Sequence, residues 1–196
     1  MCFKDCTELK FSAGKKDGYI DLCLGEEEGF NQDHFSSFRQ YAAPLWLDLR
    51  SLSLELAKMQ NQGATALASA ARHWPKLQSL DLHSNNIDGG GATALAGAAL
   101  HWPNLETLNL SFNSIADVGA LALAGAARHW PNLQTLNLSW NNIGDGGATA
   151  LVAAARHWPN LQTLKLHGNY SISEVGCSAL RDVAQRHWPL RQVLTW

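Results

Sequence analysis

The chain has 196 residues, of which 46% are hydrophobic, and its formal net charge is −2. This length and composition predict a single domain with a continuous core. The small net charge argues against a polyanion-binding protein or a basic membrane-surface protein. No apolar run approaches the roughly 18 residues of a membrane-spanning helix. We therefore expect neither a nucleic-acid partner nor a membrane partner, and the absence of a signal-peptide pattern at the N-terminus favours a cytoplasmic location.

Residues 1–44 differ from the rest of the chain and are predicted to be an N-terminal cap or a remnant segment. Strand-like runs at 7–11 and 19–24 flank a loop with two glycines, which predicts a hairpin. Residues 31–43 then predict a helix that ends before Pro44. Stacked repeats need their first strand and core covered. The segment is therefore either an integral cap or what remains of a separate domain.

Cysteines are concentrated in this N-terminal segment. Cys2, Cys6 and Cys23, together with His34, have a loose zinc-like spacing. The second pair lacks the close spacing that usually holds a tetrahedral site. We favour free thiols in a reducing compartment and expect no bound metal and no cofactor. Cys177 takes the place of an alanine in the last predicted helix, which predicts a buried core thiol.

Residues 45–196 consist of copies of one unit. His-Trp-Pro begins at His73, His101, His129 and His157 with a spacing of 28 residues, and again at His187 after 30 residues. The pattern L-x-x-L-x-L-x-x-N-x-I begins at Leu49, Leu77, Leu105, Leu133 and Leu161. The first copy is degenerate, with Ala57 at the Asn position and Met59 at the Ile position. We predict five repeats of about 28 residues and a final partial repeat, stacked as a solenoid.

Each unit combines two hydrophobic periods. Leu136 and Leu138 alternate with polar residues, which predicts a short strand with one buried face. Ala148, Leu151 and Ala155 then have helical spacing. Prolines follow the helices, and acidic residues such as Asp117 and Asp145 precede them, where they are expected to cap free amides. The acidic residues before the helices are Asp117, Asp145 and Glu174, and the prolines after them are Pro75, Pro103, Pro131, Pro159 and Pro189.

These elements predict a curved α/β fold. Parallel strands stack about 4.8 Å apart, whereas a helix with its side chains is about 10 Å wide. The strands must therefore line the concave side and the helices the convex side of a horseshoe-shaped solenoid.

The pattern L-x-x-L-x-L-x-x-N-x-I resembles the leucine-rich repeat family. The unit length of 28 residues and the helical second half are similar to the ribonuclease-inhibitor-like subclass, which includes the repeats of NOD-like receptors and Ran GTPase-activating proteins. The resemblance covers about 150 of the 196 residues. It implies a protein-binding module, although this family binds proteins of many kinds.

Four rows of side chains are expected to point outward from the strands and to line the concave surface. The rows are Ser51, Ser79, Thr107, Thr135 and Thr163; then Ser53, Asp81, Asn109, Asn137 and Lys165; then Glu55, His83, Ser111, Ser139 and His167; then Leu56, Ser84, Phe112, Trp140 and Gly168. Aromatic anchors surrounded by amides and hydroxyls are typical of protein interfaces. An alternative is that Phe112 and Trp140 only pack against each other. The candidate partner-binding residues are Asp81, His83, Asn109, Phe112, Asn137, Trp140, Lys165 and His167.

Other conspicuous residues receive structural or negative interpretations. The recurring His-Trp-Pro and Asn positions are expected to serve packing and backbone hydrogen bonding. Asp81, His83 and Ser111 contain the residue types of a hydrolytic triad, but Ser111 belongs to a recurring serine row and no G-x-S-x-G motif or oxyanion hole accompanies it. We expect no enzymatic activity.

The sequence thus predicts a monomeric protein-interaction module whose partner binds the concave face. Two alternatives stay open. The chain can be a regulatory or sensor array of a larger NOD-like receptor type protein. It can also be the substrate-recognition adaptor of a ubiquitin ligase, because its G-A-x-A-L-A segments resemble bacterial effectors with GALA-type repeats, although residues 30–47 show no convincing F-box pattern.

Overall fold

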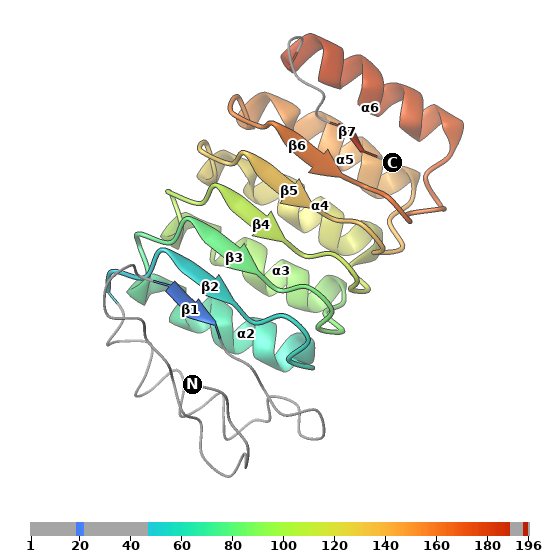
Figure 1. Ribbon diagram of the computed structural model, residues 1–196. Helices are drawn as coiled ribbons and strands as arrows, with labels where there is room; N and C mark the ends of the chain where they lie inside the picture. Colours follow the sequence, from blue (N-terminus) through green and yellow to red (C-terminus); the bar gives the residue numbers. More distant parts are fainter. Residues whose placement is uncertain (1–18, 22–46, 189–193, 196) are drawn as a thin grey trace.

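The computed structural model describes residues 19–21, 47–188 and 194–195, which form one open sheet with helices along one side (Figure 1). The sheet is parallel throughout, and its strands follow one another in chain order. The strands are β1 (Tyr19–Asp21), β2 (Ser51–Ser53), β3 (Ser79–Asp81), β4 (Thr107–Asn109), β5 (Thr135–Asn137), β6 (Thr163–Lys165) and β7 (Leu194–Thr195). The predicted solenoid with parallel strands is confirmed.

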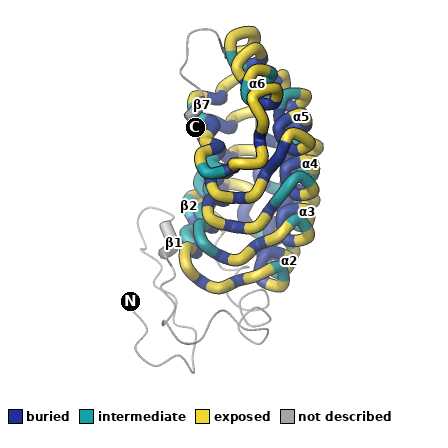
Figure 2. Tube along the Cα trace, turned by 90° about the vertical axis from the view of Figure 1, so that its right-hand side faces the viewer, coloured by how far each residue is buried: buried dark blue, intermediate teal, exposed yellow. Residues whose placement is uncertain are grey.

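A helix follows each strand from β2 to β6 and forms the convex layer. The helices are α2 (Gln60–Ala70), α3 (Gly89–Gly97), α4 (Ala116–Ala126), α5 (Asp145–Ala154) and α6 (Glu174–His187). The first four continue into short 3-10 turns, which are η3 (Ala71–His73), η4 (Ala99–His101), η5 (Ala127–His129) and η6 (Ala155–His157). Figure 2 shows strands and helices as two separate layers. Among the described residues, every helix is too short or too polar to cross a membrane.

The core lies between these layers because the central residue of each strand points inward. Leu52, Leu80, Leu108, Leu136 and Leu164 are paired in register and are at most 2% exposed. The residues on either side of each central leucine face the other way and are only partly buried or exposed. This alternation is the expected consequence of the two-residue period of a strand.

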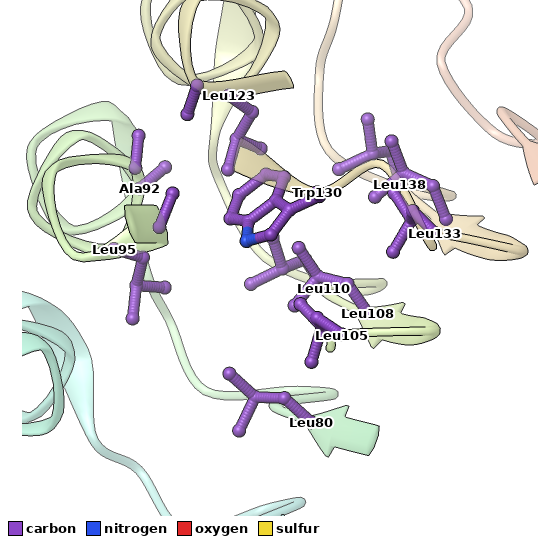
Figure 3. Close-up of a cluster of buried hydrophobic side chains, with 14 of the residues drawn as sticks. Leu80, Ala92, Leu95, Leu105, Leu108, Leu110, Leu123, Trp130, Leu133 and Leu138 are labelled. Carbon is purple, nitrogen blue, oxygen red and sulfur yellow. The ribbon is translucent and has the colours of Figure 1, made fainter. Parts of the chain in front are cut away.

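The tryptophans of the His-Trp-Pro segments fill the space between the layers. Trp74, Trp102, Trp130, Trp158 and Trp188 are at most 4% exposed. Figure 3 shows the indole of Trp130 between leucines of the strand layer, such as Leu108, and side chains of the helix layer, such as Leu123. The preceding histidines are less buried, and His129, for example, accepts a hydrogen bond from Nε of Arg128 at 3.2 Å. The predicted packing role therefore describes the tryptophans better than the histidines.

Buried asparagines connect successive repeats. Oδ1 of Asn113 accepts hydrogen bonds from the backbone N–H groups of Asn85 (3.1 Å) and Ile87 (2.9 Å) in the preceding repeat. Its Nδ2 donates to the carbonyl oxygens of Leu82 in that repeat and Leu110 in its own, both at 3.0 Å. The same arrangement recurs around Asn85, Asn141 and Asn169. The predicted structural role of the asparagine row is confirmed.

The acidic residues near the helix starts act differently from the prediction. Asp117 lies in the first turn of α4, but its Oδ1 accepts from the backbone N–H of Gly144 in the next repeat at 2.7 Å. Asp145 likewise accepts from the N–H of Ser173 at 2.8 Å. These carboxylates join neighbouring repeats rather than capping their own helices. The side chains that do cap helix starts are those of Asp88 for α3 and Ser173 for α6.

Two predictions about the ends of the chain have different outcomes. Cys177 is only half-buried and packs against the core from outside, so the expectation of a buried core thiol was wrong. The last helix has no following helix in the described residues to cover it. At the other end, β1 pairs in parallel with β2. The predicted hairpin partner at 7–11, the helix at 31–43, and Cys2, Cys6, Cys23 and His34 lie outside the described residues.

Candidate functional site

The candidate residues of the second row lie side by side at the ends of four strands. Asp81, Asn109, Asn137 and Lys165 are consecutive partners in the register from β3 to β6. Lys165 is exposed and the other three are partly buried. Because neighbouring strands are about 4.8 Å apart, these side chains form one polar line across the concave surface.

The third row is less exposed than predicted. Ser111 and Ser139 are only 3% and 7% exposed, so they do not belong to the open surface. His83 is half-buried and His167 is exposed, so the histidines at the two ends remain accessible. Both serines lie two residues beyond the ends of their strands, β4 and β5.

The fourth row does not lie on the strands. Phe112 and Trp140 come three residues after β4 and β5, in a turn where their φ angles are 55° and 57°. Leu56, Ser84 and Gly168 occupy the same turn of their repeats, also with positive φ. This left-handed region is unfavourable for bulky side chains and easy for glycine. The two large rings are therefore held at positions whose backbone geometry favours a much smaller residue.

The aromatic side chains form a continuous series along this rim, which we call the rim aromatic cluster: His83, Phe112, Trp140, His167 and Tyr170. Phe112 and Trp140 stack with ring centroids 5.4 Å apart and planes inclined by 19°. His83 meets Phe112 edge to face at 5.1 Å, and His167 meets Trp140 edge to face at 5.5 Å. Tyr170 contacts Trp140 in the same manner at 5.6 Å. These are favourable geometries for aromatic pairs.

Packing within the cluster leaves much of its surface open. Phe112 is 49% exposed, Trp140 is 37% exposed and Tyr170 is 80% exposed. The mutual packing of Phe112 and Trp140 that was considered as an alternative does occur, yet it leaves both residues exposed. Contiguous exposed apolar surface of this kind is typical of interaction sites.

A network of hydrogen bonds fixes one end of the cluster. Oδ2 of Asp81 accepts from Nδ2 of Asn109 at 3.0 Å, and Oδ1 of Asn109 accepts from the hydroxyl of Ser111 at 2.7 Å. Because this hydroxyl donates to Asn109, Nδ1 of His83 must be the donor in its 3.0 Å contact with Ser111 Oγ. Nε2 of His83 then accepts from the hydroxyl of Ser84 at 3.0 Å. The imidazole ring beside Phe112 is thus held in one tautomer and one orientation.

This network does not have the geometry of a hydrolytic triad. Oδ1 of Asp81 accepts from the backbone N–H of His83 at 2.9 Å rather than from its ring. His83 donates to Ser111 instead of accepting its proton, and Ser111 is buried. A triad needs the carboxylate on the imidazole and the imidazole as the acceptor of the serine proton. The three residues therefore serve to position the rim.

The part of the chain that the structure describes contains no group of three or more His, Cys, Asp or Glu side chains arranged to hold a metal ion.

Two family models match the repeated part of the chain. Residues 103–145 match the model described as Leucine Rich repeats (2 copies), and residues 74–96 match the model described as Leucine Rich repeat. These are leucine-rich repeats. The fold agrees, since the matched residues lie in units that each consist of a strand, an asparagine turn and a helix.

Two solved structures are similar to this chain, and the first of them has the same fold. The structure described as leiomodin-1 actin-binding site 2 is 14% identical, with a TM-score of 0.61, and the match covers 79% of this chain and 87% of that one. An internalin from Listeria monocytogenes str. 4b F2365 is 18% identical, with a TM-score of 0.41, and the match covers 79% of this chain and 50% of that one. No curated protein matches the sequence significantly.

Tyr170 belongs to the cluster but was not among the predicted residues. It lies in repeat five, where the leucine-rich repeat pattern contains one additional residue between Asn169 and Ile172. The insertion was visible in the sequence, but the turn that brings this side chain onto Trp140 was not. An aromatic residue inside an insertion next to the rim is the signal that could have identified it.

Proposed function

We propose that this array of leucine-rich repeats is a protein-interaction module that binds a protein partner across its concave face. The stacked pair of Phe112 and Trp140 is the anchor of the interface. The observation that carries the proposal is that these rings are pre-arranged by one another and remain 49% and 37% exposed. Rigid aromatic side chains of this kind contribute strongly to binding because little side-chain freedom is lost.

The surroundings of the anchor support the same function. Asp81, His83 and Asn109 lie on one side of the stacked rings, and Asn137, Lys165 and His167 lie on the other. An apolar centre with a polar border is the usual composition of a protein interface. A protein rather than a nucleic acid is the favoured partner, since the chain has a net charge of −2.

The comparisons are consistent with this proposal at the level of fold. The leiomodin-1 structure is described as an actin-binding site, so a related architecture serves protein binding there. We further infer that the repeats belong to the ribonuclease-inhibitor-like subclass and that the chain acts as a monomer. The 28-residue spacing and the helix in every repeat support the subclass.

Affinity capture with crosslinking and mass spectrometry tests the proposed function. Wild-type chain is compared with a Phe112→Ala/Trp140→Ala variant and with Leu121→Ala, a control that removes an exposed apolar side chain (64% exposed) from helix α4 on the convex layer. We expect a partner captured by wild type and by the control and not by the double variant. Thermal unfolding establishes that all three are folded. Capture of the same proteins by all three would contradict the proposal.

The expected loss is large enough to measure. Truncating an aromatic anchor typically costs about 2 kcal/mol or more of binding free energy, which is about 30-fold in Kd. Once a partner is identified, its Kd should therefore rise at least about tenfold for each single variant.

A further inference from the structure

The two ends of the rim aromatic cluster differ in how their polar groups are used. At the end formed by repeats two and three, the donor groups of Asn109 have an internal acceptor, because the carboxylate of Asp81 receives its Nδ2–H at 3.0 Å. The acceptor of Asn109 is also occupied, since Oδ1 receives the hydroxyl and the backbone N–H of Ser111. This end has both donors and acceptors, and they satisfy one another.

At the corresponding positions in repeats four and five, the donor groups of Asn137 and Lys165 have no acceptor among the described residues. Asn137 and Lys165 are direct partners in the register of β5 and β6 (Figure 1). Oδ1 of Asn137 accepts from the backbone N–H of Ser139 at 3.1 Å, but its Nδ2 donates to no described residue. Nζ of Lys165 forms neither an ion pair nor a hydrogen bond with the described part of the chain. Neighbouring strands are about 4.8 Å apart, so both groups can reach one external acceptor.

Neither neighbour of Asn137 can supply that acceptor. On one side, Oδ1 of Asn109 already receives two hydrogen bonds. On the other side, Lys165 carries an ammonium group, which has three donors and no acceptor. A carboxylate placed between Asn137 and Lys165 would accept a hydrogen bond from Nδ2 of Asn137. The carboxylate of Asp81 accepts the equivalent hydrogen bond from Asn109. Charge-assisted hydrogen bonds of this type are the stronger ones.

We propose that Asn137 and Lys165 bind the carboxylate of an aspartate or glutamate side chain of the partner, whose apolar neighbour rests on Trp140. This rests on the proposed function and specifies the chemistry of the partner. Trp140 belongs to the same repeat as Asn137, and His167 of the next repeat lies against its ring at 5.5 Å. An acidic residue next to an apolar residue therefore matches this end of the cluster.

The charge distribution favours an acidic protein side chain over a polyanion. Lys165 is the single lysine or arginine in the outward rows of the repeats, whereas Glu55 and Asp81 lie in these rows in repeats one and two. A nucleic acid crossing the surface would meet these carboxylates and find one cation. One carboxylate needs one cation and one amide, which is what the site provides.

Selection of random peptides displayed on phage tests this inference on the full chain. We expect wild-type protein to enrich peptides with Asp or Glu beside an aromatic or large apolar residue. Lys165→Gln should not enrich these peptides, whereas Arg186→Gln should. Arg186 is an exposed residue near the end of α6, so this control removes the same charge outside the site.

A double-substitution comparison makes the test quantitative. In one enriched peptide the acidic residue is changed to its amide, and affinity for wild type and Lys165→Gln is measured. Loss of a charge-assisted hydrogen bond predicts a Kd about 10-fold to 100-fold higher for either change alone. The two changes together should add little further loss, because both remove the same contact. Independent, multiplicative losses, or no effect of Lys165→Gln, would overturn the inference.

The outcomes separate this inference from the proposed function. Peptides that lose affinity for Phe112→Ala/Trp140→Ala but bind Lys165→Gln as well as wild type would support the aromatic anchor and refute the carboxylate site. Enrichment of nucleic-acid-like or phosphorylated probes alone in a parallel binding assay would refute the acidic side chain as ligand. Equal enrichment of all peptides by wild type and the double aromatic variant would contradict the proposed function itself.

Discussion

Trp140 and Gly168 contact each other across adjacent repeats, and the indole ring occupies the space that a side chain at position 168 would need. A Cβ atom on Gly168 would overlap Cδ2 of Trp140 and would lie 2.7 Å from Cε2 and 2.8 Å from Cγ. Gly168 also has a φ of 76°, in the region that glycine adopts most easily. The absence of a side chain in repeat five is therefore what lets the ring of repeat four lie flat on the rim.

Gly168→Ala should displace the Trp140 ring from its position over residue 168, while the ring itself stays in the chain. The exposed ring can rotate away, so we expect a loss of about 1 kcal/mol in unfolding free energy, mainly from alanine at positive φ. Partner or peptide affinity should fall severalfold because the stack with Phe112 is disturbed. Gly125→Ala, in helix α4 where an added methyl group meets nothing within 4 Å, is the control and should leave binding unchanged. Wild-type affinity in Gly168→Ala would show that the orientation of Trp140 is unimportant.

Replacing Phe112 with glycine should separate binding from stability. Glycine relieves the positive φ of 55° but removes the stacked ring, two effects of opposite sign. We expect the unfolding free energy to stay within about 1 kcal/mol of wild type, while partner affinity falls about tenfold or more. Denaturant titration and a binding isotherm measure the two quantities.

Phe112→Val provides the contrasting variant at this position. A β-branched residue is poorly suited to the left-handed region, so it should lower the unfolding free energy by about 1–2 kcal/mol more than glycine does. If the glycine variant were the less stable of the two, the ring of Phe112 would be a structural support rather than an exposed anchor.

Two glycines of helix α4 should respond oppositely to alanine. A methyl group on Gly119 would overlap Cγ2 of Ile115 and lie 2.8 Å from Cβ of Ala92 in the neighbouring helix, whereas one on Gly125 would meet nothing within 4 Å. Gly119→Ala should cost about 1–3 kcal/mol of unfolding free energy through overpacking. Gly125→Ala should add about 0.5–1 kcal/mol, because alanine favours helix. Chemical denaturation of both variants checks the signs, and stabilisation by Gly119→Ala would show that the helices can separate freely.

Two asparagines of repeat three should differ in their effect on stability. Asn113→Ala leaves buried backbone N–H groups of Asn85 and Ile87 without their acceptor, so we expect a loss of about 2–4 kcal/mol. Asn132→Ala removes one exposed bond, from Nδ2 to the carbonyl of Pro103 at 3.2 Å, and should cost less than about 1 kcal/mol. Similar melting temperatures for the two variants would contradict the connecting role of the buried asparagine.

The fold could be predicted because the same leucine pattern recurs in five repeats. A leucine such as Leu108 faces inward in each strand from β2 to β6, and an asparagine such as Asn113 satisfies buried backbone groups in the turns of repeats two to five. One unit alone would have been ambiguous between several short strand-and-helix motifs. Recurrence at a fixed spacing removed that ambiguity, since only a stack of parallel strands lets identical units bury identical faces.

The site could be predicted only in outline. The sequence placed Phe112 and Trp140 in one row, but their positive φ angles and their position on the rim depend on how the backbone leaves each strand. Ser111 and Ser139 appeared equivalent to exposed neighbours, because a two-residue period does not indicate where the strand ends. The acidic residues Asp117 and Asp145 suit a helix cap within their own repeat, yet the stack brings a second set of amides equally close.

The direction of the asparagine bonds has a consequence for how the chain is made. Oδ1 of Asn113 serves N–H groups that come earlier in the chain, and Asn141 and Asn169 do the same for the repeats before them. During synthesis each turn therefore leaves the ribosome with unsatisfied amides and is completed only when the asparagine 28 residues later has emerged. The growing array therefore always ends in one turn whose amides have not yet met their asparagine, whereas the turns before it are complete.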